Sequence, residues 1–101
     1  MSDDRDAIAE LVRVSRPGQA HLLLHYLYFP RERDARSAAG ELRRQGFGTE
    51  ERLGADSVNW LVLASHSVVP SEASIADARR LMESLVKPCN GEYDGWEADL
   101  T

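Results

Sequence analysis

The chain alternates between segments with helical spacing of apolar residues and segments that are apolar almost throughout. Within residues 3–15, Ile8, Leu11 and Val12 recur at spacings of three and four, which predicts one apolar stripe on a short helix. Residues 20–29 are nearly all apolar and include two tyrosines and a phenylalanine. A run of this length and composition is typical of a strand buried on both faces, in the centre of a sheet.

A helix is predicted from Pro30 to about Gln45, because proline suits the first turn of a helix. Two extended segments follow, the polar residues 47–53 and the apolar residues 58–65, and their short separation predicts a hairpin. The buried stripe of the helix is expected to be mainly alanine, which lets a helix lie close to a sheet. The stripe consists of Ala35, Ala38, Ala39 and Leu42.

A second helix is predicted from about Glu72 to Val86, with Ser71 as its N-terminal cap. Residues 92–100 then form a last strand that is rich in acidic side chains. One face of the second helix carries apolar residues at helical spacing, and this face should point to the core. It consists of Ile75, Ala78, Met82 and Leu85.

After the N-terminal helix, the order of elements is strand, helix, strand, strand, helix, strand. Two right-handed crossovers and one hairpin give an antiparallel sheet of order 4-1-3-2 with both helices on one face. This order places the two apolar strands in the centre and the two polar strands at the edges. We therefore expect a ferredoxin-like α+β fold, in which residues 1–18 form a short N-terminal helix and linker and residues 19–101 form the domain.

The predicted sheet has one face without crossover helices, yet its central strands are apolar on both sides. Successive residues of a strand point to opposite faces, so an unbroken apolar run places apolar side chains on the uncovered face as well. A contiguous apolar surface of this kind is normally buried against another element or another molecule. We expect the N-terminal helix or a second copy of the chain to cover it, and another partner is a further alternative.

Charge and cysteine content narrow the class of protein. The chain has 12 Lys and Arg against 17 Asp and Glu, a formal net charge of −5. This balance disfavours direct binding to nucleic acid and suits a basic protein partner, or solubility alone. Cys89 is the only cysteine, which excludes an internal disulfide and favours a reducing compartment. The acidic N-terminus is unlike a secretory signal and no apolar run is long enough to span a membrane, so we expect a cytoplasmic protein.

No residue pattern indicates a catalytic or a metal site, and we expect a protein that is not an enzyme and has no cofactor. His21 and His25 share one face of a strand but lie about 13 Å apart, and His66 follows a different strand. Glycine-rich phosphate-binding loops are missing from the sequence. The arginines of the first crossover helix alternate with acidic residues, which favours local ion pairs over an RNA-binding surface.

The most unusual stretch is GEYDGWE, residues 91–97. Strict alternation places Tyr93 and Gly95 on one face of the last strand, and Asp94 and Trp96 on the other. A glycine inside a strand favours a bulge or the close approach of another group. Trp96 is interpreted either as part of the core edge or as an anchor for a protein partner, since Trp dominates many interfaces.

GEYDGWE resembles the C-terminal signature of the RraB-like family, the regulators of ribonuclease E activity B. Three other segments match the family pattern in the same order, namely YFP at residues 28–30, ELRRQGF at 41–47 and WLVLA at 60–64. The resemblance covers roughly residues 20–99. It implies a ferredoxin-like fold and a protein that binds ribonuclease E and inhibits RNA cleavage without being an enzyme.

Longer members of the family carry an acidic extension after this motif, whereas this sequence ends at Thr101, so inhibition that depends on the extension is not implied here. Two alternatives to a ribonuclease regulator stay open. One is a small-molecule-binding domain with a pocket near His25 and His66, and the other is a structural homodimer packed sheet against sheet. The candidate protein-binding residues are those that match the motif: Glu92, Tyr93, Asp94, Gly95, Trp96 and Glu97.

Overall fold

The computed structural model describes residues 4–13, 16 and 18–99, apart from the side chain of residue 4. Residues 3, 14, 15 and 100, which the sequence places in the first helix and the last strand, lie outside the described residues. The elements follow the order predicted from the sequence. They are α1 (Asp4–Arg13), β1 (His21–Phe29), α2 (Glu32–Arg44), β2 (Gly48–Leu53), β3 (Trp60–Val68), α3 (Glu72–Val86), a 3₁₀ turn η1 (Lys87–Cys89) and β4 (Glu92–Asp99).

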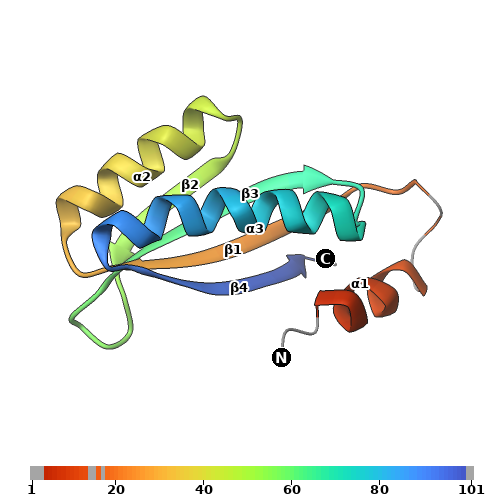
Figure 1. Ribbon diagram of the computed structural model, residues 1–101, viewed down its shortest axis with the longest axis horizontal. Coiled ribbons are helices and arrows are strands. Elements are labelled where there is room, and N and C mark those ends of the chain that lie inside the picture. The colour runs from red at the N-terminus through yellow and green to blue at the C-terminus, as the bar shows by residue number, and fades with distance from the viewer. Residues whose placement is uncertain (1–3, 14–15, 17, 100–101) are drawn as a thin grey trace.

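The four strands form one antiparallel sheet in the order β2-β3-β1-β4, which confirms the predicted order read from the opposite edge. β1 pairs with β3 from His21↔Val68 to Phe29↔Trp60, and it pairs with β4 on its other side. The two apolar strands are therefore central, and the charged strands β2 and β4 lie at the edges (Figure 1). This α+β architecture is compatible with the ferredoxin-like fold expected from the sequence.

In the hairpin between β2 and β3, the second strand lies later than predicted, since β3 runs from Trp60 to Val68 rather than from residue 58 to residue 65. Asp56 explains the late start. Its Oδ1 atom accepts hydrogen bonds of 2.9 Å from the backbone amides of Val58 and Asn59. An aspartate that binds the amides after it holds the chain in a turn, so both residues stay outside the strand.

Each crossover helix begins at a position set by its local sequence. At α3, the Ser71 hydroxyl accepts a 3.0 Å hydrogen bond from the Ser74 amide, and the Ser74 hydroxyl accepts one of 2.9 Å from the Ser71 amide. This reciprocal cap satisfies backbone donors that the first turn leaves free. α2 begins at Glu32, two residues after the predicted Pro30, since Arg31 still has extended backbone angles (φ −121°, ψ 136°).

The main core lies between the crossover helices and one face of the sheet. The alanine stripe of α2 is buried as predicted, and α2 packs against β2 and β3. On α3 the prediction is confirmed at Ile75, Ala78 and Met82, but Val86 rather than Leu85 completes the buried face. Val86 follows Ile75 by about three turns of 3.6 residues, which returns it to the same side of the helix, whereas Leu85 falls at the margin of the core.

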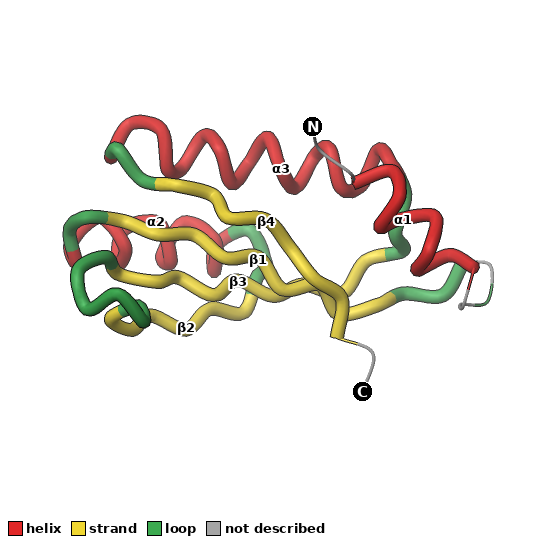
Figure 2. Tube along the Cα trace, turned by 90° about the horizontal axis from the view of Figure 1, so that it is seen from below, coloured by secondary structure: helices red, strands yellow, loops and turns green. Residues whose placement is uncertain are grey.

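The N-terminal helix does not cover the face of the sheet that lacks crossover helices, so the first of the expected covers is wrong, while a second copy and another partner stay predictions. Ile8 and Leu11 of α1 form a cluster with Leu23 of β1 and Ile75 of α3, which lie between the sheet and the helical layer. α1 lies beside the N-terminal end of α3 (Figure 2). The third residue of the predicted stripe, Val12, is 51% exposed. α1 therefore extends the helical layer instead of closing the opposite side.

The opposite side of the sheet has no covering element among the described residues, and we call it the open face. On β1, Leu23, His25, Leu27 and Phe29 are inaccessible to solvent on the helix side. The residues between them are only partly buried or, at Leu22, 38% exposed. The expectation of a strand buried on both faces is therefore wrong for the second face. By register, the open face carries Leu22, Leu24, Tyr26 and Tyr28 of β1 and Leu61 and Leu63 of β3.

Gly91 allows β4 to start close to β1, and its replacement tests this packing. A Cβ atom at Gly91 would lie 2.5 Å from the carbonyl oxygen of Tyr28 and 3.2 Å from the Cβ atom of Val86. We expect Gly91→Ala to lower the free energy of unfolding by about 1–3 kcal/mol, because the backbone must shift to relieve the overlap. Chemical denaturation measures the change.

Gly40 provides a matched control, because it lies inside α2 and a Cβ atom there meets only arginine side-chain ends at 3.8 Å. Gly40→Ala is expected to raise the free energy of unfolding by about 0.5–1 kcal/mol, since alanine restricts the unfolded chain and favours the helix. Equal effects of the two substitutions would show that the contact at Gly91 does not constrain the fold.

Candidate functional site

The GEYDGWE segment forms the start and middle of the edge strand β4, and a bulge at Gly95 shapes it. β1 and β4 pair at His25↔Trp96 and at Leu27↔Tyr93, so two residues of β4 oppose the single residue Tyr26. Gly95 has φ of 100°, a backbone conformation that residues with a side chain rarely adopt and that glycine adopts at little cost. The bulge expected from this glycine is confirmed.

The bulge corrects the predicted arrangement of side chains along the strand. His25 and Leu27 point to the helix side of β1, and Trp96 and Tyr93 are their partners on β4. Both aromatic residues of the motif therefore point to the helix side, whereas strict alternation had placed them on opposite faces. One extra residue in the strand shifts the alternation by one position, which is the physical reason for the difference.

Tyr93 is part of a buried polar network. Its side chain is 9% exposed, and its hydroxyl lies 2.8 Å from Nδ1 of His25, which has no solvent-accessible surface. The guanidinium of Arg79 lies 5.2 Å from the centroid of the Tyr93 ring, within the range of a cation–π interaction. Buried polar groups of this kind fix one arrangement of a core, since leaving them unpaired is costly.

His66 extends the network to the neighbouring strand. Its Nε2 atom lies 3.0 Å from Nε2 of His25, and its ring stacks on Phe47 with a centroid separation of 4.4 Å. The sequence named His25 and His66 together only as the surroundings of a possible small-molecule pocket. Their direct contact depends on the register between β1 and β3 and was not predicted. Within the described part of the chain, no three histidine, cysteine or acidic side chains are grouped in a way that would hold a metal ion.

Trp96 lies at the junction of β4 with the N-terminal helix. It is partly buried and packs against the cluster that Ile8, Leu11, Leu23 and Ile75 form. This position corresponds to the core-edge interpretation of Trp96 in contact with a helix. Its contribution to a partner interface is limited to the part of the indole ring that stays accessible.

The acidic residues of the motif are the ones that reach solvent. Glu92, Asp94 and Glu97 are all exposed. Glu97 accepts a 2.5 Å hydrogen bond from the Tyr26 hydroxyl, and this bond to the carboxylate, together with partial desolvation, raises the pKa of Tyr26. Glu92 and Asp94 have no hydrogen-bond or ion-pair partner among the described residues. Two free carboxylates thus stand on the same strand edge.

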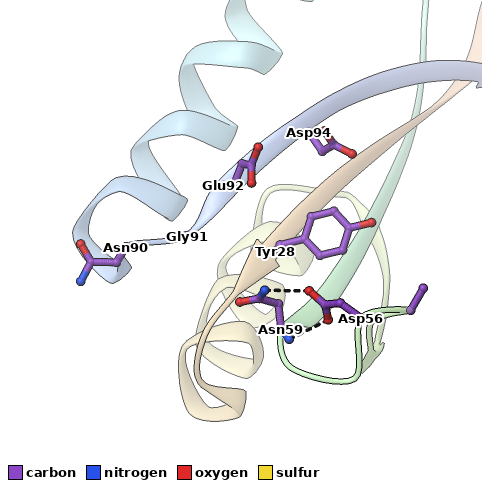
Figure 3. Close-up of a pocket in the computed structure, with 8 residues that line it drawn as sticks. Tyr28, Asp56, Asn59, Asn90, Gly91, Glu92 and Asp94 are labelled. Atoms are coloured by element: carbon purple, nitrogen blue, oxygen red, sulfur yellow. Dashed lines mark hydrogen bonds between the residues drawn. The ribbon is translucent and has the colours of Figure 1, made fainter.

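These two carboxylates border a pocket of about 370 Å³ at the Tyr28 end of the open face (Figure 3). The turn between β2 and β3 forms its other wall with Asp56 and Asn59. Hydrogen bonds from the backbone amides of Asn59 and Val58 lower the pKa of Asp56, so its carboxylate stays ionised. None of the described residues that line the pocket is basic. The pocket therefore combines negative charge with an aromatic wall, which suits a cationic group.

A family model described as "Regulator of ribonuclease activity B" matches residues 2–98 of this chain, nearly its whole length. The chain belongs to the RraB family. A comparison with curated proteins gave no match. The RraB match includes both central strands, the three helices and the GEYDGWE segment that carries the free carboxylates. None of the helices in the described residues has the length and apolar character needed to cross a bilayer.

The bulge in this RraB domain is testable at Gly95. A Cβ atom there meets no atom within 4 Å, so the effect of Gly95→Ala comes from the backbone conformation and not from a clash. We expect the alanine variant to lose about 1–2 kcal/mol of unfolding free energy. Gly95→Asn should lose less, since asparagine tolerates positive φ better than alanine. An alanine variant as stable as the unsubstituted protein would contradict this role of the bulge.

The histidine network predicts a dependence of stability on pH. Burial lowers the pKa of the His66 imidazole in the folded protein, whereas the unfolded chain retains a pKa near 6.5. The unfolded state then binds a proton more readily, so this contribution to stability is fully present above about pH 6.5 and is lost as the pH falls from there to the lower folded-state pKa. Denaturation between about pH 7 and pH 5, above the main carboxylate titrations, measures the loss.

His66→Gln is the control for this pH dependence, because it removes the titrating imidazole and keeps a polar side chain. Its free energy of unfolding should change less between the two pH values than that of the unsubstituted protein. Parallel profiles for both proteins would show that His66 is not the responsible group.

Proposed function

We propose that this protein binds a ribonuclease and regulates RNA cleavage through that contact, without catalysing a reaction itself. The observation that supports this proposal most is the match to the RraB family over residues 2–98. The sequence resemblance suggests ribonuclease E as the enzyme that is bound. The proposed location is the cytoplasm, which the single cysteine supports.

The surface chemistry supports a protein partner with a basic binding region. The chain carries a net charge of −5, and neither Glu92 nor Asp94 has an ion-pair or hydrogen-bond partner among the described residues. Opposite charge on a partner raises the rate of encounter and selects against wrong partners. The same acidic surface repels a phosphate backbone, so we propose that the RNA itself is not bound directly.

The six candidate residues of the motif divide into two groups in this proposal. Glu92, Asp94 and Glu97 are exposed and are proposed to contact the partner. The other three shape the strand: Gly95 makes the bulge, Tyr93 joins the histidine network and Trp96 packs beside α1. The acidic residues then give the charge that attracts the partner, while the aromatic residues hold the strand in the position that presents it.

The test measures binding and RNA cleavage with purified ribonuclease E from the same host. The unsubstituted protein should bind the enzyme and lower its cleavage rate. Glu92→Gln with Asp94→Asn should slow association roughly three- to tenfold at low salt and weaken its salt dependence, because two attracting charges are lost. Stopped-flow or surface-based kinetics at several salt concentrations give both quantities.

Asp6→Asn with Glu83→Gln is the matched control, since it removes the same charge from α1 and α3. Neither side chain has a hydrogen-bond or ion-pair partner among the described residues, so folding should be unaffected. We expect this control to associate nearly as fast as the unsubstituted protein. The proposal fails if the unsubstituted protein neither binds the ribonuclease nor changes its activity.

A further inference from the structure

The open face is apolar along its centre. By register, Leu22, Leu24, Tyr26 and Tyr28 follow one another along β1 on this side, and Leu63 lies beside them on β3. An antiparallel sheet can leave one face in water, but the strand positions that point to such a face are normally polar. Here β1 places leucine or tyrosine at every outward position from Leu22 to Tyr28, and β3 adds Leu61 and Leu63 before it changes to Ser65 and Ser67. This pattern is the one expected of a surface that another element covers.

The charged residues on the open face indicate which kind of molecule is complementary to it. The strand register places carboxylates along its border, and the only basic residue among the strand positions of this face is Arg52, whose Nη1 atom lies 3.4 Å from Glu50. A second copy of the chain would bring another acidic surface against the first, which is unfavourable. A basic partner has the complementary charge. The acidic residues of the face are Glu50, Glu92, Asp94, Glu97 and Asp99.

The pocket continues the open face at its Tyr28 end. Tyr28 belongs to both, and Glu92 and Asp94 stand on the far side of its ring from Asp56 (Figure 3). A guanidinium group fits this combination, since it stacks on an aromatic ring and donates hydrogen bonds to carboxylates in its plane. The open face is apolar and the pocket at its end is anionic. A partner segment complementary to both carries a row of apolar side chains with an arginine at one end.

We infer that the open face and the pocket together bind a basic amphipathic helix of the partner protein. Its apolar side lies on Leu22, Leu24 and Tyr26, and an arginine near one end enters the pocket between Tyr28 and the free carboxylates. This inference rests on the proposed function and adds the surface and the chemistry of the partner. From Leu22 to Tyr28 the strand spans about 20 Å, which corresponds to about 13 residues of helix.

Leu22→Ser with Leu63→Ser tests the apolar part of the surface. Both side chains are at least partly accessible, so the variant should still fold, and a thermal unfolding curve checks this. We expect at least tenfold weaker binding to purified ribonuclease E, because two apolar contacts are lost. The matched control is Val12→Ser with Leu53→Ser, which removes exposed apolar side chains away from the open face and should bind normally.

A second probe tests the surface without the ribonuclease. A short amphipathic helical peptide of leucine and arginine is titrated into the isotope-labelled protein and followed by nuclear magnetic resonance. Saturable shifts should concentrate at Leu22, Leu24, Tyr26 and Tyr28. The same peptide with glutamate in place of arginine should cause no saturable shifts, since it lacks the complementary charge.

The outcomes separate this inference from the proposed function. If the ribonuclease binds the open-face variant as tightly as the unsubstituted protein, the surface is wrong and the function stands. If the ribonuclease does not bind at all, the function is wrong, and the peptide decides the surface: shifts on the open face support it, whereas shifts elsewhere or none overturn it. A homodimer in sedimentation equilibrium that dissociates on Leu22→Ser with Leu63→Ser would also overturn it, because a second copy would then occupy the face.

Discussion

The glycine bulge in β4 is the constraint on which the arrangement of this molecule depends. A regular strand would turn Tyr93 and Trp96 to opposite faces. Because Asp94 and Gly95 together oppose Tyr26, both aromatic side chains face the helices. Tyr93 then reaches His25, and Trp96 reaches the cluster beneath α1. The edge strand is thereby fixed at two points, and the acidic residues between and beside these points stay in solvent.

The two fixed points serve different parts of the fold. At Tyr93, a hydrogen bond to His25 ties β4 to the centre of the sheet, and a cation–π contact with Arg79 ties it to α3. At Trp96, apolar packing ties β4 to the N-terminal helix, whose own cluster includes Leu23 of the central strand. A motif that joins three elements in this way constrains the chain strongly. Because Tyr93 and Trp96 are held in the core while the acidic residues beside them point to solvent, residues that stabilise the fold and residues that face solvent are interspersed within these seven positions.

The sequence predicted the features that depend on local periodicity, and it missed those that depend on register. Sheet order and the α2 stripe followed from apolar spacing, and Gly95 indicated the bulge. The sides of Tyr93 and Trp96 were wrong because the alternation was continued through that bulge. The pairing of His25 with His66 joins positions 41 residues apart, so no local pattern reveals it. An amphipathic stripe likewise shows that α1 must be buried, but not against which surface.

The two edges of the sheet are poorly suited to the addition of a partner's strand. An edge strand normally offers free backbone groups to another strand. β4 interrupts that row with a bulge, and both edge strands carry charged side chains, devices that natural sheets use against strand addition. The helix side is already filled by α1, α2 and α3. Of the surfaces that the sheet presents, the open face is the one that combines accessible apolar side chains with the unpaired carboxylates of Glu92 and Asp94, and this combination is why we infer that a partner binds there.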